Sequence, residues 1–120
     1  MIRGLGTDII EIERIKAAED KGGRLSKRIL SEEEMEVYRT LSSEKRRMEY
    51  LAGRFAVKEA YSKALGSGIG ERITFSDITC LNDEAGKPFI SGEECAHVSI
   101  SHSNHYATAT VILENKGRGD

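Results

Sequence analysis

One acidic residue, Glu59, lies where a long helix should be apolar. The segment from Ser42 or Ser43 to Leu65 has helical spacing. At about 100° per residue its apolar side chains gather on one face; they are Met48, Leu51, Ala52 and Phe55. Glu59 falls in the middle of this face, where an ionised carboxylate is costly unless a cation or metal ion compensates its charge. Two partners are open: an intrahelical pair with Lys63 at i+4, or a divalent metal.

Asp8 is a second acid in an unusual setting. It follows Gly4 and Gly6 on the same face of a strand predicted over residues 2–7, so little side-chain bulk lies beside it. An ordinary structural role is open as well: Asp8 could cap a following helix, with Glu11 three residues later completing a capping box. Taken together, Asp8 and Glu59 favour another interpretation, because two carboxylates with waters and phosphate oxygens are what Mg²⁺ usually accepts.

Basic residues accompany the two acids. On the helical wheel Arg47, Arg54 and Lys58 form a predicted cationic edge beside the apolar face. Such an edge would hold the rest of a polyphosphate whose other oxygens bind the metal. The combination indicates phosphoryl-group chemistry.

The elements that must position these residues begin with a strand and several helices. We expect a short helix after Asp8 that Gly22-Gly23 ends, and another turn or helix over residues 24–30. Ser31 opens a third helix with a capping box and acids in its first turn, and this helix reaches about Arg39. The longest helix then ends at Gly66 and Gly68.

The second half of the sequence has β texture. Strands are predicted over residues 72–80, 97–101 and 106–113, with a turn over residues 83–88 and a hairpin linking the last two strands. The expected fold class is α+β: an N-terminal strand and helices, with the long helix packed on an antiparallel sheet. The length of 120 residues suits a single domain, 1–120.

Composition restricts the class of protein. Cys80 and Cys95 do not make a disulfide framework, the first residues become acidic too early for a secretory signal, and no apolar run approaches bilayer length. We therefore expect a cytoplasmic protein.

Residues 14–28 are rich in Lys and Arg although the chain has a net charge of −2, which indicates either an acidic partner or a solvated helix face. The acidic balance and 6% aromatic content argue against nucleic-acid binding.

Several phrases of the sequence resemble one known family. They are Gly4-Leu5-Gly6-Thr7-Asp8-Ile9, Gly53-Arg54-Phe55-Ala56-Val57-Lys58-Glu59-Ala60, Ser62 to Gly70, Asn82 to Pro88, and Val98-Ser99-Ile100-Ser101-His102-Ser103. Together they are similar to the holo-acyl-carrier-protein synthases, the short bacterial type of 4′-phosphopantetheinyl transferase. The resemblance runs from residue 2 to about residue 112.

The resemblance implies roles for individual residues. Asp8 and Glu59 would hold Mg²⁺, with Mn²⁺ as an alternative, and Lys63 would contact the transferred phosphate. The coenzyme A nucleotide would lie among Lys45, Arg46, Arg47, Arg54, Gly66, Ser67 and Gly68, with His102 close to coenzyme A at the pocket wall. Arg14, Arg24 and Arg28 would face the acidic helix of the carrier protein. The resemblance also implies that the chain assembles as a homotrimer, with active sites between the subunits.

The implied reaction moves 4′-phosphopantetheine from coenzyme A to a serine of apo acyl carrier protein, gives holo carrier and 3′,5′-ADP, and supports fatty acid biosynthesis. The catalytic set would be Asp8, Glu59, Lys63 and His102. The base that deprotonates the serine stays open among a metal-bound water, Glu59 and His102. The alternative function is a nucleotide- or carrier-binding module without transferase activity.

Overall fold

The computed structural model describes residues 1–66 and 74–115. The helices and strands of these residues, in chain order, are β1 (Ile2–Glu11), α1 (Ile12–Glu19), α2 (Arg24–Ile29), α3 (Glu32–Thr40), α4 (Glu44–Leu65), the 3₁₀ helix η1 (Phe75–Asp77), β2 (Cys80–Asn82), β3 (Pro88–Ile90), β4 (Ala96–His102) and β5 (Tyr106–Glu114). This order confirms the predicted α+β class. None of the described helices is both long and apolar enough to cross a membrane.

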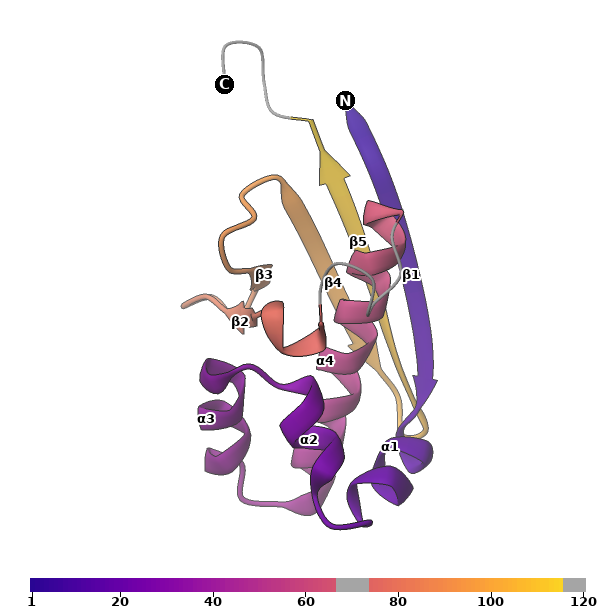
Figure 1. Cartoon of the computed structure of the whole chain (residues 1–120), viewed down its shortest axis with the longest axis vertical. Coiled ribbons are helices and arrows are strands. Elements are labelled where there is room, and N and C mark those ends of the chain that lie inside the picture. Colours follow the sequence, from indigo (N-terminus) through magenta and orange to yellow (C-terminus); the bar gives the residue numbers. More distant parts are fainter. Residues whose placement is uncertain (67–73, 116–120) are drawn as a thin grey trace.

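The main sheet has three antiparallel strands in the order β1-β5-β4, and β2 and β3 form a separate hairpin. Helix α4 lies along one face of the main sheet, and α1, α2 and α3 gather around the first half of α4 (Figure 1). Within the described residues no helix covers the other face of the sheet (Figure 1). Side chains that point toward α4 therefore line the core, and those on the other face stay open.

Two glycines let α4 rest directly on the backbone of β1. A Cβ atom at Gly6 would lie 1.9 Å from the carbonyl oxygen of Ala60, and one at Gly4 would lie 2.1 Å from that of Ala64. No side chain fits at such distances, so only glycine permits this approach. The predicted small-residue face is confirmed, and Asp8 is the next residue on it.

The local signals at helix ends are confirmed. The hydroxyl of Ser31 accepts from the backbone N–H of Glu34, and the Glu34 carboxylate accepts from the N–H of Ser31, which makes the predicted capping box. Helix α4 begins after Ser43, whose hydroxyl accepts from the N–H of Arg46. It ends at Gly66, whose φ of 83° is the left-handed conformation that favours glycine.

The capping role considered for Asp8 is wrong. Strand β1 continues to Glu11, with Asp8 paired to Ala109 of β5, and α1 begins at Ile12 with no side-chain cap. The β-branched residues Ile9 and Ile10 suit the extended ladder that β5 offers, and this long-range pairing overrides the local capping signal.

The predicted strand over residues 72–80 is also wrong in most of its length. Residues 72 and 73 lie outside the described residues, Phe75–Asp77 form the 3₁₀ helix, and only Cys80 enters a strand. The Asp77 carboxylate accepts from the N–H and the hydroxyl of Thr74, both at 2.9 Å. These local side-chain hydrogen bonds offer the backbone a turn in place of a ladder.

Candidate functional site

The predicted acids Asp8 and Glu59 come together where α4 crosses β1. Lys63, one turn after Glu59, donates to the carbonyl oxygen of Thr7 at 2.9 Å and to Oδ1 of Asp8 at 3.2 Å. The Asp8 side chain is 15% exposed and that of Lys63 is 54% exposed, so the cluster is reachable from solvent. The intrahelical Glu59–Lys63 pair is not the arrangement found, because Lys63 takes Asp8 as its partner.

The pKa of Glu59 is raised from its ordinary value. Burial is the main cause, the negative charge of Asp8 adds to it, and the positive charge of Lys63 partly offsets both. Two carboxylates thus face a shared space in which one of them is poorly solvated. A cation between them would relieve this repulsion.

The donor set fits Mg²⁺. It consists of carboxylate oxygens, which hard cations prefer, and it supplies only a few ligands. Among residues 1–66 and 74–115 no group of three or more His, Cys, Asp or Glu side chains could hold a metal ion. Mg²⁺ commonly binds through one or two carboxylates and takes its other oxygens from water and substrate phosphate.

A hollow of about 320 Å³ adjoins this cluster at the edge of the main sheet. Asp8 and Lys63 line it together with side chains of the outer face of the sheet, namely Thr7, Ile9, Thr108 and Thr110. The cluster is therefore continuous with the face that no described helix covers.

A larger groove of about 710 Å³ lies between the first half of α4 and the β2–β3 hairpin. It brings together three of the predicted cofactor-binding residues, Arg46, Arg54 and His102. Its other walls are Val37, Leu41, Glu49, Tyr50, Gly53, Leu81, Asn82, Gly86, Pro88 and Ile100.

Arg54 is part of the groove wall, where its guanidinium has partners in the β2–β3 hairpin. The residue is only 7% exposed, and its Nε donates to the carbonyl oxygen of Cys80 at 3.1 Å. Its Nη2 donates to Asn82, and its guanidinium lies 4.4 Å from the ring centroid of Tyr50. Arg54 therefore ties the β2–β3 hairpin to α4. Of the predicted cationic edge, Arg54 lines the groove, whereas Lys58 is fully buried and does not line it.

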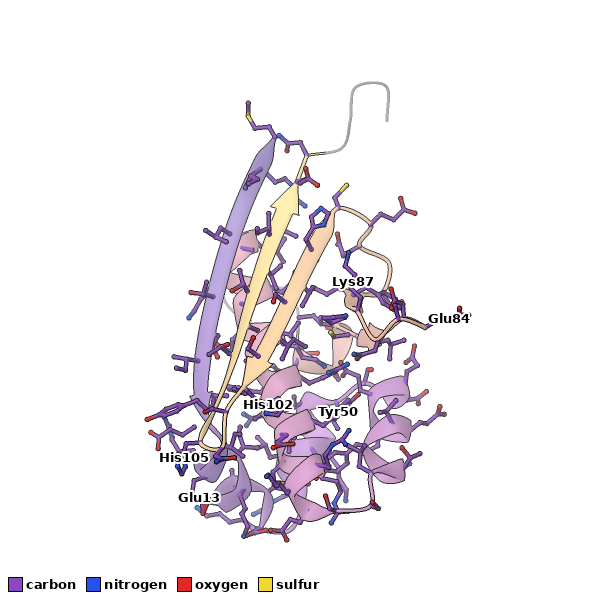
Figure 2. All side chains as sticks on the ribbon, turned by 180° about the vertical axis from the view of Figure 1, so that it is seen from behind. Glu13, Tyr50, Glu84, Lys87, His102 and His105 are labelled. Carbon is purple, nitrogen blue, oxygen red and sulfur yellow. The ribbon has the colours of Figure 1, made fainter. Side chains whose placement is uncertain are left out.

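His102 ends β4 beside the groove. Its Nδ1 lies 3.7 Å from Oε2 of Glu49, and Figure 2 shows His102 and Tyr50 at this end of the molecule. His102 pairs with Ala107, and Asp8 pairs with Ala109, on opposite sides of β5. Directly paired residues point to the same face, so His102 and Asp8 both point toward α4. From strand spacing and rise their Cα atoms are roughly 12 Å apart.

Of the other residues predicted to bind the nucleotide, those that the structure describes do not line this groove. Lys45 is exposed and does not line the groove. Arg47 donates to the carbonyl oxygen of Leu41 at 2.9 Å and supports the turn before α4. Gly66 is the C-cap of α4. Ser67 and Gly68 lie outside the described residues.

A basic hollow of about 400 Å³ marks the region predicted to face the carrier protein. Arg24 and Arg28 of α2 line it together with Lys21, Ala18 and Leu25. Arg14 is exposed on α1 but does not line this hollow.

Some residues of the site region were not predicted. Tyr50 and Glu49 line the groove, and Glu34 forms a buried ion pair with Lys58, the residue before Glu59 in α4. The Ser31 capping box already drew attention to Glu34, but no local pattern indicates that a carboxylate at that position reaches a lysine 24 residues later.

Comparisons with known proteins agree on one family. Residues 4–111 match the family model of the 4′-phosphopantetheinyl transferase superfamily. The chain is 52% identical over 115 residues to a holo-[acyl-carrier-protein] synthase of Staphylococcus aureus strain JH9, covering 95% of this chain and 97% of that one.

Solved structures give the same result. A holo-(acyl-carrier-protein) synthase from Bacillus anthracis strain Ames, in complex with CoA (3′,5′-ADP), superposes with a TM-score of 0.89 at 48% identity and covers 97% of this chain and 99% of that chain. The Helicobacter pylori holo-[acyl-carrier-protein] synthase in complex with coenzyme A gives a TM-score of 0.79 at 32% identity, covering 92% and 99%.

Proposed function

The chain belongs to the 4′-phosphopantetheinyl transferase superfamily, and from this membership we infer that it is a holo-acyl-carrier-protein synthase. It transfers 4′-phosphopantetheine from coenzyme A to a serine of apo acyl carrier protein, yielding the holo carrier and 3′,5′-ADP for fatty acid biosynthesis. Residues 1–120 act as one transferase domain. The observation that carries this function is the convergence of Asp8, Glu59 and Lys63 in a chain of this family.

Asp8 and Glu59 hold the metal in this proposal. A bound Mg²⁺ would neutralise the pyrophosphate of coenzyme A and so stabilise the leaving 3′,5′-ADP. The raised pKa of Glu59 supports this role, because the site disfavours two bare carboxylates and a cation removes that penalty.

Lys63 stabilises the transferred group. In the free protein its ammonium binds Asp8 and the backbone of Thr7, and its 54% exposed side chain leaves it able to turn toward a phosphoryl oxygen. A cation beside the reacting phosphate offsets the charge that spreads over its oxygens in the transition state.

The groove beside α4 receives the nucleotide end of coenzyme A. Arg46 offers a solvent-facing cation, and His102 with Glu49 closes one side. His102 also provides an imidazole for proton transfer from the attacking serine, with its Nδ1 3.7 Å from Oε2 of Glu49.

The basic hollow on α2 docks the carrier. Positive charge surrounds this small depression, from Lys21, Arg24 and Arg28. The exposed Arg14 of α1 adds a further positive charge. Such a surface attracts and orients an acidic helix.

The protein acts as a homotrimer in the cytoplasm. The outer face of the main sheet carries exposed apolar side chains, with Leu5 at 60% and Ile9 at 61% exposure, and a second subunit seated there would close the hollow beside Asp8. Cys80 and Cys95 are both free thiols, as in a reducing compartment.

A mass measurement tests the reaction. Purified protein is mixed with apo acyl carrier protein, coenzyme A and Mg²⁺, and the carrier is weighed by mass spectrometry with an EDTA control. We expect a carrier heavier by one phosphopantetheine only when the metal is present. An unchanged carrier, with several carriers tried and the enzyme folded, would favour a binding module instead.

A further inference from the structure

The ion pair between Lys58 and Glu34 is the most buried charged group of the described chain that the proposed mechanism does not use. Both side chains are 0% exposed, and Nζ of Lys58 lies 2.5 Å from Oε1 of Glu34. A buried ion pair is weak evidence for stability, because desolvation of both charges offsets their attraction. Lys58 directly precedes Glu59 in α4, which suggests a role in the site.

Every proton of the Lys58 ammonium has an acceptor. Besides Glu34, Nζ donates to the carbonyl oxygen of Ile29 at 2.6 Å and to that of Phe75 at 3.0 Å. Ile29 is the last residue of α2, Glu34 belongs to α3, and Phe75 begins η1. One side chain of α4 is therefore bound to three different elements.

The Glu34 carboxylate is held at both of its oxygens. Oε1 also accepts from the N–H of Ser31 at 2.9 Å, and Oε2 accepts from the N–H of Cys80 at 2.8 Å. The contacts of Lys58 and Glu34 form a connected network, here called the Lys58 junction, which joins α4 to α2, α3, η1 and β2. Such a network is rigid because each of its members is satisfied.

The junction and the glycines of β1 constrain α4 in different ways. Gly4 and Gly6 fix how closely α4 lies on β1, but glycines supply no side chain that would resist rotation of the helix about its axis. The junction, on another side of α4, opposes that rotation. A side-chain atom about 5–6 Å from the axis would move roughly 2 Å for a 20° rotation. Mg²⁺ accepts ligands only near about 2.0–2.1 Å, in nearly ideal octahedral geometry.

We propose that Lys58 and Glu34 are positioning residues that fix the rotation of α4 and thereby hold the Glu59 carboxylate opposite Asp8 at a separation that binds the metal. This inference rests on the proposed metal role of Asp8 and Glu59. Neither Lys58 nor Glu34 touches the substrate or the metal.

The test compares variants by metal affinity as well as stability. Lys58→Met with Glu34→Gln removes both charges while keeping side-chain length, so neither charge is left buried and unpaired. Tyr61→Phe is the matched control: it removes a hydrogen bond of 2.8 Å to Glu93 from the same helix and leaves the junction intact. Mn²⁺ is titrated calorimetrically into each protein with coenzyme A present and carrier absent, and the Tm is measured in parallel.

We expect the double variant to bind Mn²⁺ about 10–100-fold more weakly than the parent, as for outer residues that orient metal ligands. Tyr61→Phe should lower Tm without changing Mn²⁺ affinity. Parent-like Mn²⁺ binding in the folded double variant overturns the positioning role. If the double variant does not fold, Lys58→Gln with Glu34→Gln, which keeps a hydrogen-bond donor and acceptor at both positions and leaves no buried charge, takes its place and is judged by the same two results.

Glu59→Gln distinguishes a failure of the positioning role from a failure of the proposed metal site at Asp8 and Glu59. Weak Mn²⁺ binding by Glu59→Gln together with parent-like binding by the junction variant overturns the positioning role alone. Parent-like binding by Glu59→Gln shows that the metal site itself is wrong, and the positioning role falls with it.

Discussion

At the scale of single residues, the site is defined by two carboxylates at positions where their helix and strand would ordinarily carry apolar or small side chains. Glu59 was predicted from the apolar pattern that it interrupts, and Asp8 from the two glycines before it; the structure places both beside Lys63. Lys58 could not be predicted in the same way. The helical wheel assumes one buried side, whereas α4 is covered by the main sheet on one side and by α2, α3 and η1 on another.

Metal binding should depend on pH because of Glu59. Its pKa is raised above the ordinary value of 4.5, so protons compete with the metal at a higher pH than they would at an ordinary glutamate. Mg²⁺ affinity should therefore fall as the pH falls toward 4.5, and binding on the acid side should release a proton. Calorimetry in buffers of different ionisation enthalpy measures that release.

Asp8→Asn provides the control for this pH dependence. It removes the negative charge that helps to raise the pKa of Glu59, so that pKa should move down toward its ordinary value. If Asp8→Asn still binds the metal, its binding should release fewer protons and depend less on pH than binding by the parent. A parent protein that binds Mg²⁺ equally well across the acid range would contradict the assignment of Glu59.

At the scale of elements, local signals predicted the helix ends and the β4–β5 hairpin better than the extent of β1 and the segment before β2. The Ser31 capping box and the Gly66 C-cap were found where predicted, because their hydrogen bonds join residues close in sequence. The extension of β1 to Glu11 depends on pairing with β5, about a hundred residues away in the chain, which a local pattern does not reveal. The 3₁₀ helix Phe75–Asp77, found where part of a strand was predicted, depends on the Asp77 carboxylate accepting from the N–H of Thr74.

The contact of β1 with α4 can be tested by Gly6→Ala. The added methyl would lie 1.9 Å from the carbonyl oxygen of Ala60, so strand and helix must move apart. We expect a loss of about 1–3 kcal/mol in the free energy of unfolding, together with weaker metal binding because Asp8 moves with its strand. Urea unfolding and metal titration measure the two effects.

Gly53→Ala is the matched substitution for that experiment. Gly53 lies within helix α4, and a methyl added there would contact only the side chain of Ile100 in β4, at 3.4 Å. Its stability should be unchanged or higher by up to about 1 kcal/mol, since alanine favours the helix. Equal destabilisation by both substitutions would show that the close approach of β1 and α4 is not what Gly6 provides.

At the scale of the whole molecule, the uncovered face of the main sheet predicts self-association. Leu5→Glu places a charge in the exposed apolar face, and we expect light scattering to show a change from about three chains per particle to one, with loss of transfer activity. Phe89→Glu, at an exposed position of the separate β2–β3 hairpin, should keep the parent's mass. A parent protein that is already a monomer at working concentration would contradict the trimer.

The central claim is that Asp8 and Glu59 hold the metal on which phosphopantetheine transfer depends, and Glu59→Gln tests it in the carrier mass assay. Because its pKa is raised, ionised Glu59 favours the unfolded chain at neutral pH, so the neutral Gln should leave the free energy of unfolding unchanged or higher. We predict a folded variant with unaltered or higher Tm and a carrier whose mass does not change. A folded Glu59→Gln protein that modifies the carrier at the parent's rate would contradict the account.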